Sequence, residues 1–127
     1  MRVLIVEDFV PFRQFVCSTL GSKPELQVVG EASDGLEAVQ KAEEMKPDLI
    51  LLDIGLPSLN GIAAARQIRK LSPESKIIFL SQESSADIIQ EALNLGAWAY
   101  VVKTRAETDL LAAVDSVLRG KVFVSNT

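Results

Sequence analysis

The chain has 127 residues, of which 48% are hydrophobic and 24% are charged, the balance of one folded domain rather than of a disordered segment. Its net charge is −4 and its 13 Lys and Arg residues are scattered, so we expect no direct binding of nucleic acid by this stretch. Histidine is absent, which excludes imidazole metal sites and Ser-His or Cys-His catalysis, and the single cysteine excludes an internal disulfide.

Short apolar segments rich in Val, Ile and Leu alternate with longer segments of helical spacing. In chain order, the predicted strands are Arg2–Val6, Gln27–Glu31, Leu49–Leu52, Lys76–Leu80 and Ala99–Val102. Several of these are continuous apolar runs, which are typical of strands buried on both faces of a parallel sheet. The first apolar stripe of helical spacing consists of Phe12, Phe15, Val16 and Leu20, and the last consists of Leu110, Ala113, Val114 and Val117.

Helix boundary signals agree with this alternation. Pro11 stands where a first helical turn tolerates proline, and Asp34 followed three residues later by Glu37 resembles a capping box. The pair Asn60-Gly61 turns the chain before the third helix, and Gly96 ends the fourth. Five strands alternating with five helices predict an α/β fold, the flavodoxin-like (βα)5 doubly wound parallel sheet with strand order 2-1-3-4-5.

The aliphatic runs are far too short to span a bilayer, and acidic residues arrive too early in the chain for a leader peptide. A lone thiol, Cys17, fits a reducing compartment. We therefore expect a cytoplasmic protein that does not enter a membrane.

Polar residues interrupt the apolar runs at the carboxyl end of four predicted strands. Glu7 and Asp8 follow the first strand, Asp53 follows the third, Ser81 the fourth and Lys103 the fifth. Ligands of open parallel sheets bind at this edge, where the strand order reverses, so these side chains are expected to converge.

The chemistry of such a cluster points to a metal ion and a phosphoryl group. Three neighbouring carboxylates repel one another unless a cation intervenes, and an oxygen-only ligand set favours Mg²⁺ over Zn²⁺. Lys103 would add a fixed positive charge and Ser81 a hydrogen-bond donor, which suits the negative charge of a transferring phosphoryl group. Each residue alone has a structural interpretation as a helix cap or a surface charge; their joint occurrence at one sheet edge favours the site.

These motifs resemble the receiver domain of bacterial two-component response regulators over nearly the whole chain. The matching segments are Val-Glu-Asp at 6–8, Asp-Ile-Gly-Leu-Pro at 53–57 with Asn-Gly at 60–61, Ser81, and Gly-Ala at 96–97 followed by Tyr-Val-Val-Lys at 100–103. The resemblance implies that Asp53 accepts a phosphoryl group from a sensor histidine kinase or a phosphotransfer protein. It also implies that Glu7, Asp8 and the backbone carbonyl of Gly55 hold Mg²⁺ together with Asp53.

The same resemblance implies a switch. Ser81 would move to bond the phosphate, Tyr100 would swing inward, and the surface of the fourth helix, fifth strand and fifth helix would change. The alternative for Tyr100 is a half-buried ring on an edge strand. Two further residues would tune phosphate lifetime: Gly55 has no side chain to shield the phosphate from water, and Glu83 could orient an attacking water.

Residues 1–119 are expected to form the receiver domain, and residues 120–127 to begin a linker. The segments 96–103 and 119–125 are similar to those of receivers that precede a LuxR-type helix-turn-helix domain, which implies transcriptional output through a C-terminal DNA-binding domain and possible homodimers on phosphorylation. Thr104 stands where many receivers have a proline after a cis peptide, so the geometry of the Lys103–Thr104 bond is open. Two alternatives stay open: a stand-alone or degenerate receiver that acts as a protein-interaction module, and a flavin-binding protein of the same architecture.

Overall fold

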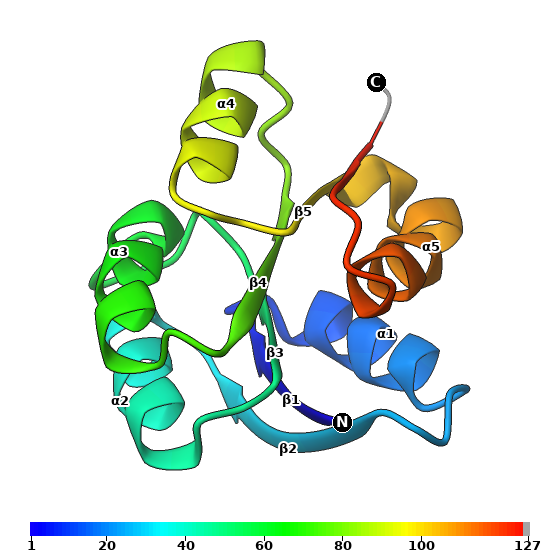
Figure 1. The fold of residues 1–127 in the computed structure, drawn as a ribbon, viewed down its shortest axis with the longest axis horizontal. Coiled ribbons are helices and arrows are strands. Elements are labelled where there is room, and N and C mark those ends of the chain that lie inside the picture. The colour runs from blue at the N-terminus through cyan, green and yellow to red at the C-terminus, as the bar shows by residue number, and fades with distance from the viewer. Residues whose placement is uncertain (126–127) are drawn as a thin grey trace.

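A computed structural model describes residues 1–125, in which six parallel strands form one sheet with helices on both faces (Figure 1). The strands are β1 (Arg2–Val6), β2 (Gln27–Ala32), β3 (Leu49–Leu52), β4 (Lys76–Ser81), β5 (Ala99–Val102) and β6 (Phe123–Val124). The helices are α1 (Val10–Leu20), α2 (Gly35–Met45), α3 (Gly61–Leu71), α4 (Ala86–Asn94) and α5 (Ala106–Leu118), with a short 3₁₀ helix, η1 (Lys103–Arg105), before α5. The predicted order of the first five strands is confirmed, and β6 extends it to β2-β1-β3-β4-β5-β6.

Two apolar layers enclose the sheet. Side chains alternate along each strand, so Leu4 and Val6 of β1 pack with α2, α3 and α4, whereas Val3 and Ile5 pack with α1 and α5. The two groups of helices lie on opposite faces of the sheet in Figure 1. All four residues of β3 are buried, as its continuous apolar sequence predicts for a central strand.

Side-chain caps fix the helix starts that the sequence predicts. The Asp34 carboxylate accepts a hydrogen bond from the Glu37 amide at 2.8 Å, and the Glu37 carboxylate accepts one from the Ser33 amide at 2.8 Å. Asn60 caps α3 by accepting from the Ala63 amide at 2.9 Å. These caps define the first residues of α2 and α3, and therefore the ends of the β2–α2 and β3–α3 loops.

The sixth strand differs from the sequence-based prediction, which treats everything after residue 119 as linker. Phe123 and Val124 pair in parallel with Ala99 and Tyr100 of β5. Tertiary hydrogen bonds hold this segment, because the Ser125 hydroxyl donates to Asp109 at 2.8 Å and accepts from the Val102 amide at 3.2 Å. A two-residue strand carries no periodicity of its own, which is why the pattern did not predict it. The last two residues of the expected linker, 126–127, lie outside the described residues.

Within residues 1–125, none of the helices combines the length and the apolar character that crossing a membrane would require.

Candidate functional site

A cleft of about 570 Å³ opens at the carboxyl ends of the strands. Its lining residues are Glu7, Asp8, Phe9, Phe12, Asp53, Gly55, Ser81, Gln82, Glu83, Lys103 and Thr104. They come from the ends of β1, β3, β4 and β5 and from the start of α1. The convergence that the sequence predicts is therefore present, and seven of the eight predicted site residues line this one cleft; the eighth, Tyr100, lies beneath it on β5.

Three carboxylates form the acidic part of the cleft. Glu7, Asp8 and Asp53 each offer an oxygen, and these oxygens lie within 4.8 Å of one another. Glu7 is only 3% exposed and Asp53 only 6%, whereas Asp8 is open to solvent. Two buried carboxylates and one exposed one make a site that is fixed at its base and open at its mouth.

Lys103 supplies the positive charge of the cleft. Its Nζ lies 2.5 Å from a Glu7 carboxylate oxygen and 3.2 Å from Asp53 Oδ2. Burial lowers the pKa of the Lys103 ammonium, but its hydrogen bond to Glu7 and the nearby charges of Asp53 and Glu7 outweigh that effect, so the pKa lies above its usual value. Lys103 is therefore charged throughout the physiological pH range.

Backbone contacts position Asp53 rigidly. Its amide donates to the Val6 carbonyl at 3.1 Å, which ties the end of β3 to β1. The Gly61 amide donates to the Ile54 carbonyl at 2.8 Å, and a Cβ on Gly61 would stand only 2.0 Å from the Asp53 carbonyl oxygen. Glycine at position 61 thus lets α3 start directly against the chain that carries Asp53.

Glu7 is held by hydrogen bonds from both sides. One carboxylate oxygen accepts from the Phe9 amide at 3.0 Å, and the other faces Lys103. Burial raises the pKa of Glu7, the hydrogen bonds from Lys103 and Phe9 lower it, the Asp53 charge raises it, and the resulting pKa lies above the usual value. A further cation in the cleft would therefore stabilise the ionised form of Glu7.

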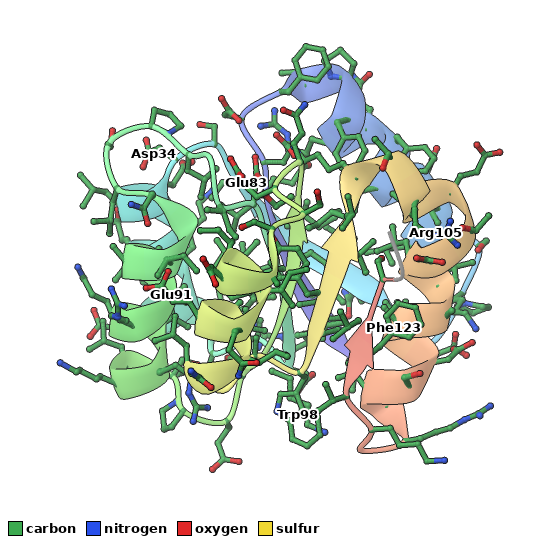
Figure 2. The ribbon with its side chains drawn as sticks, turned by 90° about the horizontal axis from the view of Figure 1, so that it is seen from above. Asp34, Glu83, Glu91, Trp98, Arg105 and Phe123 are labelled. Carbon is green, nitrogen blue, oxygen red and sulfur yellow. The ribbon has the colours of Figure 1, made fainter. Side chains whose placement is uncertain are left out.

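The β4–α4 loop joins the cleft to Tyr100. Ser81 is buried, and its hydroxyl accepts a hydrogen bond from the Glu83 amide at 3.1 Å. The Tyr100 hydroxyl donates to the Glu83 carbonyl at 2.7 Å. The Glu83 side chain itself is exposed at the rim, at the opposite end of the sheet from Trp98 (Figure 2).

The structure places the Tyr100 ring inside the protein. Its exposed fraction is 0%, and its ring centroid lies 6.1 Å from that of Phe79. Burial raises the pKa of the Tyr100 phenol above its usual value. Because β6 covers the outer side of β5, the alternative of a half-buried ring on an edge strand is wrong.

The backbone shows the geometry of the Lys103–Thr104 peptide and the space beside Gly55. The Lys103–Thr104 peptide is trans, and η1 begins at Lys103 directly after β5. At Gly55, no atom of the described residues lies within 4 Å of the place that a Cβ would occupy, so a side chain at this position would extend into open space.

Sequence patterns assign Phe12 and Phe15 to the core stripe of α1, but Phe12 also belongs to the cleft. Its ring centroid lies 4.8 Å from Lys103 Nζ. Gln82, directly after Ser81, also lines the cleft without having been predicted. The position of Phe12 in the first turn of α1, just after the acidic pair, is the signal that points to this role.

The donor set of the cleft fits a hard divalent cation. All three clustered ligands offer carboxylate oxygens, and the exposed position of Asp8 leaves room for water and for an anionic group. Mg²⁺ prefers such ligands and combines one or two carboxylates with waters and phosphate oxygens. The fold and the site together define an α/β protein with an acidic cleft whose donor set fits a cation, and with a lysine beside a buried aspartate.

Comparisons with known proteins identify the family. Residues 3–115 match the response regulator receiver domain family. The chain therefore belongs to this family, whose members are the receiver domains of two-component systems.

A curated relative is also a response regulator. The chain is 36% identical over 121 residues to the response regulator protein VraR of Staphylococcus aureus, covering 95% of this chain but only 58% of that protein. The chain thus spans little more than half the length of the curated relatives that it matches.

Solved structures show the same fold. A LuxR family two-component response regulator from Aurantimonas sp. SI85-9A1 matches with a TM-score of 0.90 at 29% identity, over 96% of this chain and 87% of that one. The isolated REC domain of RcsB from Salmonella enterica serovar Typhimurium, in the presence of phosphomimetic BeF3-, matches with a TM-score of 0.93 at 25% identity, over 99% and 94%. The response regulator domain of Thermotoga maritima CheB is 38% identical, with a TM-score of 0.79 over 94% and 92%.

Proposed function

We propose that this receiver domain is a phosphorylation switch in which Asp53 accepts a phosphoryl group from a histidine kinase or a phosphotransfer protein. The observation that carries the proposal is the buried Asp53 carboxylate with Lys103 Nζ at 3.2 Å, at the base of a cleft that also holds Glu7 and Asp8. Family membership supports the same role.

The transfer step follows from these groups. A carboxylate oxygen of Asp53 attacks the phosphorus of the donor's phosphohistidine, a P–O bond forms, and the N–P bond breaks. The imidazole leaves with the electron pair and takes up a proton. Lys103 stabilises the negative charge on the equatorial oxygens of the phosphoryl group, because its ammonium is fixed beside the acceptor.

Glu7, Asp8, Asp53 and the carbonyl of Gly55 would hold Mg²⁺ in this proposal. When bound, the ion supplies positive charge that offsets the repulsion between the carboxylates and the incoming phosphate. Glu7 contributes a buried carboxylate that the Phe9 amide orients at 3.0 Å, and Asp8 contributes an exposed one at the mouth. Reset is the attack of water on phosphorus, which breaks the P–O bond, releases phosphate and restores the Asp53 carboxylate; Glu83 at the rim and the bare Gly55 would tune this rate.

Signal output would pass through Ser81 and Tyr100. Both side chains bond to the backbone of Glu83, so a movement of Ser81 toward a phosphoryl oxygen changes the loop that Tyr100 also holds. We propose that the surface of α4, β5 and α5 reports this change. It would reach a partner receiver in a phosphorylation-driven dimer or a DNA-binding domain that follows residue 127.

Relatives support this organisation. The chain covers 58% of VraR, which leaves room in such proteins for a second domain. Transcriptional regulation in the cytoplasm is the proposed output, with residues 1–119 and the paired strand β6 as the receiver and the chain leading onward from that strand. We assign no DNA contact to the receiver itself, because its net charge is −4 and its basic residues are scattered.

The test is phosphorylation by a small phosphodonor. Wild-type protein incubated with acetyl phosphate and Mg²⁺ should gain one phosphoryl group by intact mass, and Asp53→Asn should gain none. Asp48→Asn, an exposed aspartate at the opposite end of β3, is the matched control and should behave as wild type. Equal incorporation into Asp53→Asn would refute the acceptor role, and no incorporation into wild type would favour a degenerate receiver that acts only as an interaction module.

A further inference from the structure

We propose that Phe12 is a positioning residue for Lys103, whose ammonium its ring face keeps against Asp53 during phosphoryl transfer. This inference rests on the proposed function of Asp53 and extends it to a residue outside the charged set.

The contact is a cation–π interaction inside the cleft. Lys103 Nζ lies over the Phe12 ring, 4.8 Å from its centroid, and both residues line the cleft. An ammonium within about 6 Å of a ring centroid is attracted by the negative face of the ring. The Lys103 side chain is only 12% exposed, so water screens this attraction weakly.

The ring is itself held in place. Phe12 lies in the first turn of α1, and its ring centroid is 5.5 Å from that of Phe15, with the two planes tilted by 36°. Both rings pack against the apolar layer formed by β1, α1 and α5. Phe12 therefore presents a fixed surface to a side chain that is otherwise flexible.

Lys103 needs such a surface because its long stem has many rotamers. Three groups surround the ammonium, namely the carboxylates of Glu7 and Asp53 and the ring of Phe12. Both carboxylates have other tasks in the proposed reaction, since Glu7 would hold the cation and Asp53 would become an acyl phosphate. The ring is the one member of this set whose attraction for the ammonium stays the same through the reaction.

Kinetics provide the first test. Phe12→Leu keeps an apolar side chain but removes the ring face, so the rate constant for phosphorylation by saturating acetyl phosphate should fall by about three- to tenfold. Phe12→Tyr keeps the ring and should restore the rate, while the Kd for Mg²⁺ should be the same in all three proteins. Phe15→Leu is the matched control, because it makes the same change one turn along α1 outside the cleft and keeps an apolar side chain against the Phe12 ring, and it should lower the rate less than Phe12→Leu does.

Nuclear magnetic resonance provides a test that needs no phosphorylation. The ε-methylene protons of Lys103 should resonate upfield in wild type and Phe12→Tyr, because they lie over a ring, and should return to ordinary values in Phe12→Leu. Phe15→Leu should leave them upfield. Circular dichroism and thermal melting of each variant identify any loss of fold.

The outcomes separate this inference from the proposed function. If Phe12→Leu phosphorylates at the wild-type rate, or if Lys103 shows no ring-current shift in the wild type, the positioning role is refuted while Asp53 keeps its role. Equal losses in Phe12→Leu and Phe15→Leu would refute it as well, since packing of the aromatic pair would then be the cause. A folded wild type with the ring-current shift but without phosphorylation would instead overturn the proposed function.

Discussion

The hydroxyl of Tyr100 donates a hydrogen bond to the backbone carbonyl of Glu83 at 2.7 Å, which joins the centre of β5 to the loop above the cleft. Tyr100 is fully buried, so this bond forms away from competing water. The same loop residue donates its amide to Ser81 at 3.1 Å. The inward position of Tyr100 is therefore tied to the conformation of the β4–α4 loop.

Tyr100→Phe should lower the free energy of unfolding by about 1 kcal/mol, because the Glu83 carbonyl loses its donor in a buried setting. Urea unfolding followed by circular dichroism measures the change. Glu83→Ala is the control, since the bond uses the backbone of residue 83, and this variant should unfold like wild type. If the unfolding curve of Tyr100→Phe matched that of wild type, this hydrogen bond would not contribute to the stability of the fold.

Lys103→Met should destabilise the metal-free protein by about 3 kcal/mol at neutral pH, because two buried carboxylates lose their shared counter-charge. Saturating Mg²⁺ should recover part of this loss by binding the folded state. Thermal melts with and without Mg²⁺ measure both effects. Lys23→Met removes an exposed ion pair to Asp115 and should change little. If both substitutions had equally small effects on the melting temperature, the buried carboxylates would not need Lys103 as a counter-charge, and the prediction would be wrong.

Asp109→Asn should lower the free energy of unfolding by about 2 kcal/mol at neutral pH. This difference from wild type should shrink as the pH falls. Burial raises the pKa of Asp109, but hydrogen bonds from Ser125, Arg105 and Thr108 outweigh it and hold the pKa below its usual 3.8. The ionised form therefore stabilises the fold above pH 3.8, and this contribution is lost as the pH falls below 3.8 through the folded-state pKa.

Urea unfolding of wild type and Asp109→Asn between neutral and acid pH tests this dependence. The two unfolding free energies should converge in acid. Asp115→Asn, on the same helix but 42% exposed, is the control and should differ little from wild type at any pH. A gap that stays constant into acid would refute the role of the ionised Asp109 in anchoring Ser125 and β6.

Gly55→Leu should prolong the lifetime of the phosphoryl group severalfold, because a side chain there would shield the phosphate from water. The substitution should fold normally, since a Cβ at position 55 meets no atom within 4 Å. Loss of phosphate after removal of the donor, followed by intact mass, gives the lifetime. Gly61→Ala provides the contrast, because its Cβ would collide with the Asp53 carbonyl oxygen at 2.0 Å and should impair folding itself. An unchanged lifetime in well-folded Gly55→Leu would contradict the shielding account.

The sequence predicted the first five strands to within one residue because several are apolar runs and because signals such as the Asp34 cap after β2 and Gly96 before β5 mark where strands end and begin. It also predicted which polar residues share the cleft, since the carboxyl ends of parallel strands lie on one edge. Strand β6 escaped prediction because its pairing depends on Ser125 bonding to Asp109, a contact between distant segments. The position of Phe12 just after the acidic pair points to the cleft, but its contact with Lys103 depends on how α1 crosses the sheet.

The acceptor role of Asp53 is tested most directly by locating the phosphoryl group. Reduction of the phosphorylated protein with borohydride converts an aspartyl phosphate to homoserine, and peptide mass spectrometry then identifies the residue. Our account predicts homoserine at position 53 after treatment with acetyl phosphate and Mg²⁺, and unmodified aspartate there without Mg²⁺. Homoserine at position 8 or 48, or phosphate retained on a serine with Asp53 unmodified, would contradict it.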